Sequence, residues 1–438
     1  MAGIIETARK PGPGRLRGAL LALVIAAGLV AAGVWFFTGG GGLVPSRASI
    51  EGQVVRAPTA DGADRVFVMT SQWRSFRARG TYTGTTYGGL IVDVWAFDPA
   101  TGKPVWRQRL VDDRRAVNMG RRLLGAHGGI LWLFDGKSLL GLSPKDGSRV
   151  ADNGTFAAAN PMLRGVMPTE ERYIRFDPQG LSFTAADGRD WRLTGQGAAT
   201  RPDGARLDTD AERAAPQPGV FLAARNAGGV GSWMFYTGGL ELGGGRWLGL
   251  LADAEAANLG AEGAVGGVDP QTYPRTRLYS ATVVRGAMSS MFRPVATNAK
   301  PLPESPEFLS AGLLQDGRCC HGRPILLSNP DSVLVIHRDR LGDQSRLKLT
   351  RVAGPLGKPL WTADLPLEKL EAVLPGERTL VLVGRRDEPP LFRTRDNRPE
   401  SVDQLVSVDL ASGRLAPYGF RVAPTAPNDL PESSTPPP

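Results

Sequence analysis

Short apolar runs bounded by Gly, Asp, Asn and Pro follow one another along the chain from residue 46 onward. Helical spacing of apolar positions is almost absent from the same region. Runs of this kind are typical of strands joined by tight hairpins. The pattern therefore predicts an all-β body, with candidate strands at 65–71, 90–97, 130–134, 173–176, 333–337 and 380–383.

One strand, turn and strand unit recurs, and its best copy is the segment 96–106, AFDPATGKPVW. Asp98 and Thr101 can bond backbone groups of the turn, and Gly102 can adopt a positive φ. Trp106 then returns on the next strand as a large packing surface. Weaker copies lie at 142–147, 183–191 and 404–413.

The end of this unit recurs at 357–361, GKPLW, where Gly357 and Trp361 repeat the positions of Gly102 and Trp106. Pro104 and Pro359 have no N–H for a central ladder, so each belongs on an edge strand. In a radial blade the edge strand is the outermost one, and a repeated unit favours such blades over a sandwich.

The residues Ala96, Asp98, Thr101, Gly102 and Trp106 match every fixed position of A-x-D-x-x-T-G-x-x-x-W. This is the tryptophan-docking motif of pyrroloquinoline-quinone-type β-propeller repeats, which the chain resembles. Quinoprotein alcohol dehydrogenases and the lipoprotein propeller of the outer-membrane barrel assembly machinery carry such repeats. The resemblance implies a β-propeller of four-stranded blades.

The meander count places units near 65–110, 121–152, 172–194, 219–252, 275–298, 333–365 and 378–420. We therefore expect seven blades, with six or eight as alternatives. Residues 50–55 are expected to complete the last blade and close the ring.

The N-terminal region contains one long uncharged apolar run, residues 18–37, GALLALVIAAGLVAAGVWFF. Its length suits a single transmembrane helix, and its bulky end at Trp35 fits a signal anchor better than the alternative, a cleaved signal peptide. Cations cluster before the run, so the N-terminus 1–17 is expected in the cytoplasm. The Gly-rich stretch 38–48 is then a flexible linker, 49–423 the propeller domain and 424–438 a disordered Pro-rich tail.

Part of the net charge of +9 comes from a cluster before the apolar run, which consists of Arg9, Lys10, Arg15 and Arg17. The remaining excess is spread too thinly for a nucleic-acid footprint, so nucleic acid is excluded as a partner. The densest later stretch is predicted to be a solvated loop, with phosphate-bearing polymers or lipids as the alternative ligand. It contains Arg107, Arg109, Asp112, Asp113, Arg114, Arg115, Arg121 and Arg122.

The only constellation that suggests a mechanism is Cys319, Cys320 and His321. Adjacent Cα atoms are about 3.8 Å apart, below the usual disulfide range of about 4.4 to 6.8 Å, so a vicinal disulfide would be strained. We interpret the pair as structural or incidental. The alternatives are metal binding by all three residues and, as the resemblance implies for quinoprotein dehydrogenases, contact of the cysteine pair with pyrroloquinoline quinone beside calcium.

Seven tryptophans are expected to pack between blades, with a carbohydrate groove as the alternative: Trp95, Trp106, Trp132, Trp191, Trp233, Trp247 and Trp361. The sequence contains no P-loop, no GxSxG elbow and no GxGxxG before a helix. Catalytic residues stay unassigned, and no cofactor is expected.

The function that we predict is a non-enzymatic protein-binding scaffold, anchored in the bacterial inner membrane with its propeller in the periplasm. Its expected partners are the membrane and other envelope proteins, and its oligomeric state stays open. The alternative is a quinone- or metal-dependent periplasmic oxidoreductase of the quinoprotein type.

Overall fold

The computed structural model describes the body of the chain in segments. These are residues 46–77, 86–113, 120–177, 180–194, 198–200, 235–236, 239–243, 246–258, 274–284, 295–314, 332–342, 345–389 and 399–422. The described residues are nearly all β, in antiparallel sheets, which confirms the predicted fold class at that level.

The N-terminal half contains three four-stranded antiparallel meanders, numbered here in chain order. The first meander comprises β3 (Val55–Pro58), β4 (Asp64–Arg77), β5 (Thr86–Asp98) and β6 (Lys103–Asp113). The second comprises β7 (Arg122–His127), β8 (Ile130–Phe134), β9 (Leu139–Leu142) and β10 (Arg149–Asp152). The third comprises β11 (Ile174–Asp177), β12 (Gly180–Thr184), β13 (Asp190–Thr194) and β14 (Ala198–Thr200).

The C-terminal half contains three more. The fourth meander comprises β16 (Gly239–Gly243), β17 (Arg246–Leu251), β18 (Arg275–Val284) and β19 (Val295–Pro301). The fifth comprises β20 (Phe308–Leu314), β21 (Ser332–Arg338), β22 (Leu347–Ala353) and β23 (Pro359–Asp364). The sixth comprises β24 (Lys369–Leu374), β25 (Thr379–Glu388), β26 (Glu400–Asp409) and β27 (Leu415–Gly419).

The described part therefore contains six meanders, where the sequence predicted seven units with six as an alternative. The reason is that the units predicted at 219–252 and 275–298 contribute to one meander: β17 pairs along its length with β18. The start of β18 also pairs with β20, which joins the fourth and fifth meanders in one nine-stranded sheet. Pro104 and Pro359 lie on β6 and β23, each at the edge of its sheet, as predicted.

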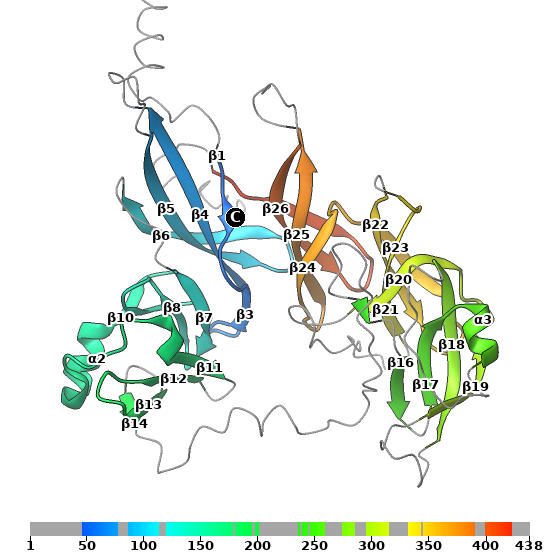
Figure 1. Ribbon diagram of the computed structural model, residues 1–438, viewed down its shortest axis with the longest axis horizontal. Coiled ribbons are helices and arrows are strands. Elements are labelled where there is room, and N and C mark those ends of the chain that lie inside the picture. Colours follow the sequence, from blue (N-terminus) through cyan, green and yellow to red (C-terminus); the bar gives the residue numbers. More distant parts are fainter. Residues whose placement is uncertain are drawn as a thin grey trace, which may run out of the picture.

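Apolar clusters join neighbouring meanders. One lies between the first and second, one between the second and third, one between the fourth and fifth, and one between the fifth and sixth. A fifth cluster joins the sixth meander back to the first. The meanders thus form an arc (Figure 1). Its order is third, second, first, sixth, fifth and fourth. Among the described residues no such cluster links the third meander to the fourth.

The two ends of the described chain meet at this first and sixth junction. β1 (Ser46–Arg47) pairs with β28 (Arg421–Val422), and the Ala48 N–H donates to the Phe420 carbonyl at 3.2 Å. The expectation that 50–55 belongs to the last blade is wrong, because β2 (Ser49–Ile50) and β3 both pair with β4 of the first meander. The residues that reach the C-terminal strand are 46–48.

Helices within the described segments are few and short. α2 (Asn153–Ala159) and α3 (Asp253–Asn258) follow β10 and β17, and 3-10 turns occupy Pro161–Leu163 and Glu171–Tyr173. β15 (Phe235–Tyr236) pairs with β20. Within the described ranges no helix is long and apolar enough to cross a membrane, and the predicted span 18–37 lies outside them.

Candidate functional site

Four meanders carry the same turn between their third and fourth strands. In each turn a glycine N–H donates to the carbonyl four residues earlier: Gly102 to Asp98, Gly147 to Ser143, Gly357 to Ala353 and Gly413 to Asp409, at 2.8 to 2.9 Å. All four glycines have φ between +68° and +77°, a left-handed conformation that favours glycine. The turns 98–103, 143–148, 353–358 and 409–414 are therefore equivalent, and can be compared position by position.

The first of these turns is built from the predicted motif residues. The Thr101 hydroxyl donates to the Asp98 carboxylate at 2.8 Å, and the same carboxylate accepts from the Ala100 N–H at 3.0 Å. Ala96 is fully buried and lies opposite Trp106 in the β5 and β6 pairing. The motif thus fixes both the turn and the position of the tryptophan that follows it.

Trp106 packs on the turn of the second meander. A Cβ added to Gly147 would lie 2.7 Å from the Trp106 ring, and the indole Nε1 donates to the Pro144 carbonyl at 3.0 Å. Trp361 repeats both contacts on the sixth meander: it covers Gly413 at the same 2.7 Å and donates to the Leu410 carbonyl at 2.9 Å. In both junctions the carbonyl of the second turn residue accepts an indole N–H.

The junction between the sixth and first meanders uses a hydroxyl at the same place. The Ser407 Oγ donates to the carbonyl of Pro99, the second residue of the turn 98–103. Ala416 on β27 lies against Gly102, where the other two junctions have a tryptophan ring. Arg56 adds a polar contact, because its guanidinium donates to the carbonyls of Leu374 at 3.0 Å and Thr379 at 2.8 Å.

The fourth and fifth meanders meet differently. Leu302 and Ser305 cover Gly357, and no tryptophan lies on this turn. The second residue of the turn is Gly354, and its carbonyl has no hydrogen-bond partner within the described part of the chain. A groove of about 580 Å³ opens at this junction.

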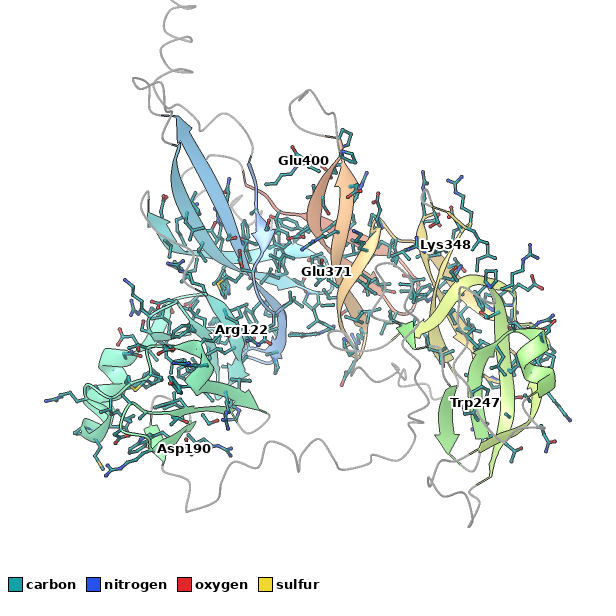
Figure 2. All side chains as sticks on the ribbon, in the orientation of Figure 1. Arg122, Asp190, Trp247, Lys348, Glu371 and Glu400 are labelled. Carbon is teal, nitrogen blue, oxygen red and sulfur yellow. The ribbon has the colours of Figure 1, made fainter. Side chains whose placement is uncertain are left out.

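The groove is our candidate functional site. Its walls come from β17, β18 and β19 of the fourth meander and from Gly354 and Pro355 in the turn of the fifth. Its apolar floor includes Leu248, Ala281 and Leu302, which are buried. Trp247 also lines it, is 1% exposed, and has an indole Nε1 without a partner among the described residues. Figure 2 shows Trp247 on the fourth meander and Lys348 on the neighbouring fifth.

The polar side of the groove is cationic. Arg246 and Lys300 are exposed, and neither forms an ion pair with a described residue. Ser280, Thr282 and Asn298 add hydroxyl and amide groups. No Asp or Glu is among the residues that line the groove. The site can therefore receive an apolar group together with a negative charge.

A second polar cluster lies at the first and sixth junction, and the sequence reading missed it. Asp93 is 2% exposed and accepts from Arg107 Nη2 at 2.6 Å and from Arg109 Nε at 3.1 Å. The Arg107 guanidinium also lies 4.7 Å from the centre of the Trp95 ring. Arg107 and Arg109 therefore lie on strand β6, which corrects the prediction of a solvated loop there. Their alternation on one strand opposite an acidic residue was the available signal.

Aromatic packing surrounds this cluster. Tyr418 lies 4.9 Å from Phe97 and 6.3 Å from Trp95, measured between ring centres, and burial raises the pKa of its hydroxyl. These rings seal the junction from the solvent, and the paired arginines balance the buried carboxylate. This packing supports a structural role for the cluster of Asp93, Arg107 and Arg109.

The remaining predicted residues fall in three groups. Cys319, Cys320 and His321 lie outside the described residues, as does Trp233. Trp95, Trp132, Trp191 and Trp247 are buried, like Trp106, and the first three lie in apolar clusters between neighbouring meanders. His337 is half-buried against the Phe308 ring, and its Nε2 lies 2.8 Å from the Thr350 Oγ1; burial lowers its pKa. No group of three metal-ligating side chains occurs within the ranges described above.

Comparisons with known proteins give distant likenesses. No family model matches the chain, and no curated protein matches it. The comparisons assign it no family. Similar solved structures include BamB from Moraxella catarrhalis, at 10% identity over 85% of this chain and 100% of that one, with a TM-score of 0.18.

Two other solved structures are similar at the same level. The quinohemoprotein alcohol dehydrogenase of Comamonas testosteroni is 10% identical over 86% of this chain and 68% of its own, with a TM-score of 0.22. The WD40 domain of SCAP from fission yeast is 7% identical over 86% and 87%, with a TM-score of 0.22. Scores this low leave the function to be argued from the site.

Proposed function

We propose that the chain is a binding scaffold of the bacterial cell envelope, built as a β-propeller and anchored in the inner membrane by residues 18–37. The propeller would lie in the periplasm, and its partners would be other envelope proteins. The apolar N-terminal run and the cations before it support the anchor and its orientation.

The observation that carries the proposal is a repeated exposed edge. β6, β10 and β23 each pair on one side only, so their outer backbone groups have no strand partner within the described sheets. Each exposes one apolar residue three positions after the turn glycine: Val105 at 39%, Val150 at 48% and Leu360 at 50%. Edge strands that expose apolar side chains are a common route to peptide capture.

Site-specific photo-crosslinking in living cells tests this function. A benzophenone amino acid would replace Val105, Val150 or Leu360 in the full chain, and Glu377, an exposed turn residue, would serve as the control. We expect discrete adducts with envelope proteins from the edge positions and none from position 377. Equal labelling at all four positions, or no adduct at any of them, would contradict a scaffold that uses these edges.

A thermal unfolding measurement separates this function from the oxidoreductase alternative. The purified full chain would be melted with and without pyrroloquinoline quinone and calcium. A ligand present at 100 times its dissociation constant adds about 2.7 kcal/mol to the stability of the folded state. A scaffold predicts an unchanged midpoint, whereas a clear rise would favour the quinoprotein reading and direct mutagenesis to Cys319 and Cys320.

A further inference from the structure

The groove at the fourth and fifth junction is best understood by comparison with its neighbours. In three equivalent turns the carbonyl of the second residue accepts a hydrogen bond from the preceding meander: Pro144 and Leu410 from an indole, and Pro99 from a hydroxyl. The corresponding carbonyl of Gly354 accepts none from the described residues, and it lines the groove. A hydrogen-bond acceptor is thus left open at a turn that borders a groove.

The opposite wall is the apolar face of β17. Leu248 on that strand and Leu302 after β19 are buried, belong to the cluster between the two meanders, and line the groove. The junction therefore presents an open backbone acceptor beside an apolar floor.

The rim of the groove determines the charge of the ligand. Arg246 and Lys300 stand at its exposed side without an acidic partner among the described residues, and no carboxylate lines the groove. Two unpaired cations beside an apolar cavity favour a ligand that joins an apolar group to a carboxylate.

We infer that this groove binds an aromatic side chain flanked by carboxylates, presented by an acidic segment of a partner protein. Leu302 and Ser305 already cover Gly357, so the ring lies beside them in the groove, and its N–H or O–H donates to the Gly354 carbonyl. The flanking carboxylates pair with Arg246 and Lys300. This inference rests on the proposed scaffold function and names the partner chemistry of one of its surfaces.

Short labelled peptides test the inference on the full chain in detergent micelles. The probe is acetyl-Gly-Glu-Trp-Asp-Gly-amide with a fluorescent label, and its binding is followed by polarisation. One control replaces Trp by Ala, and a second replaces both acids by Lys. We expect each control to bind at least about tenfold more weakly than the probe, because it lacks either the ring or the charge.

Variants of the chain locate the binding site. Lys300→Glu should weaken the probe by about tenfold and strengthen the lysine peptide. Lys369→Glu makes the same charge change at an exposed position of β24, outside the groove lining, and should leave both affinities unchanged. Ser280→Trp should abolish probe binding by filling the groove, whereas the same change at the exposed residue Ser401, at the start of β26, should not.

A methyl NMR signal gives a readout at the site itself. The Leu248 methyl resonances, assigned by their loss in Leu248→Met, should shift when the probe binds, because the aromatic ring of the probe changes their environment. Equal binding of the Trp and Ala peptides, or binding that Lys300→Glu and Ser280→Trp both leave intact, would overturn the inference. That failure is distinct from failure of the scaffold function, which the edge-strand crosslinks measure independently.

Discussion

The junction between the first and second meanders and the junction between the fourth and fifth place the same turn against different neighbours. In the first, Trp106 covers Gly147 and its indole donates to the Pro144 carbonyl. In the second, Leu302 and Ser305 cover Gly357, the Gly354 carbonyl is left open, and a groove lies beside it. The difference shows that the same backbone turn either packs against the preceding meander or forms the wall of a groove. The side chain supplied by the preceding meander decides which.

Removing the tryptophan ring from a docked junction should have the largest effect on stability. Trp106→Ala should reduce the free energy of unfolding by about 3 to 5 kcal/mol, since Trp106 is 6% exposed and fills the space above the turn. Urea unfolding of the full chain, followed by circular dichroism, measures the loss. Trp361→Ala is the partner variant and should lose less, because Trp361 is only partly buried. A loss below about 1 kcal/mol for Trp106→Ala would show that docking contributes little to stability.

Two glycines with nearly the same backbone conformation separate the effect of the ring contact from the effect of the backbone. Gly147 and Gly188 have nearly the same φ, +75° and +78°, but an added Cβ would strike the Trp106 ring at the first and meet nothing within 4 Å at the second. Gly188→Ala should therefore cost about 1 to 2 kcal/mol, from the left-handed backbone alone. Gly147→Ala should cost about 1 to 3 kcal/mol more, because the methyl group displaces the ring. Equal losses in the two variants, measured by the same urea unfolding, would mean that the ring moves aside freely.

The smallest expected effect is a dependence on pH within the fifth meander. Burial lowers the pKa of His337, although the carboxylates of Asp339 and Asp364 oppose the shift and Lys348 adds to it. The unfolded chain then binds more protons in mild acid, so the stability that the neutral ring contributes is present above about pH 6.5. It is lost as the pH falls through the native pKa.

Thermal unfolding of the wild type and of His337→Gln between pH 5 and pH 8 measures this contribution. The wild type should lose stability below about pH 6.5, and the variant should lose less over the same interval. Parallel curves for the two proteins would mean that another group causes the acid response.

Much of the architecture could be predicted from local sequence. The turn residues Asp98, Thr101 and Gly102 specify their hairpin through contacts within a few positions, and Pro104 and Pro359 lie on edge strands because they have no N–H. The meander count was harder, since β17 and β18 join in one sheet across a long connection that the local pattern does not reveal.

The candidate groove could not be predicted, because its walls come from segments far apart in the sequence. Arg246 and Lys300 resemble ordinary surface cations, and nothing near them in the chain shows that they border a groove. The Asp93 cluster left one local signal, the alternation of Arg107 and Arg109 along a strand. The carboxylate that they contact lies on the neighbouring strand, so the local signal does not identify it. Local patterns thus predict turns and edges, whereas sites depend on which meanders become neighbours.

The contact between the first and sixth meanders can form only after most of the chain has been synthesised. Ser407 and Pro99, which bond across it, are 308 residues apart. At about 5 to 20 residues per second, ribosomes need on the order of 15 to 60 seconds to synthesise that interval. The apolar face of the first meander, including Trp95 and Phe97, has no sixth meander to cover it during this time. A holding chaperone would have its longest period of access at that face, and the last strands to emerge would end it.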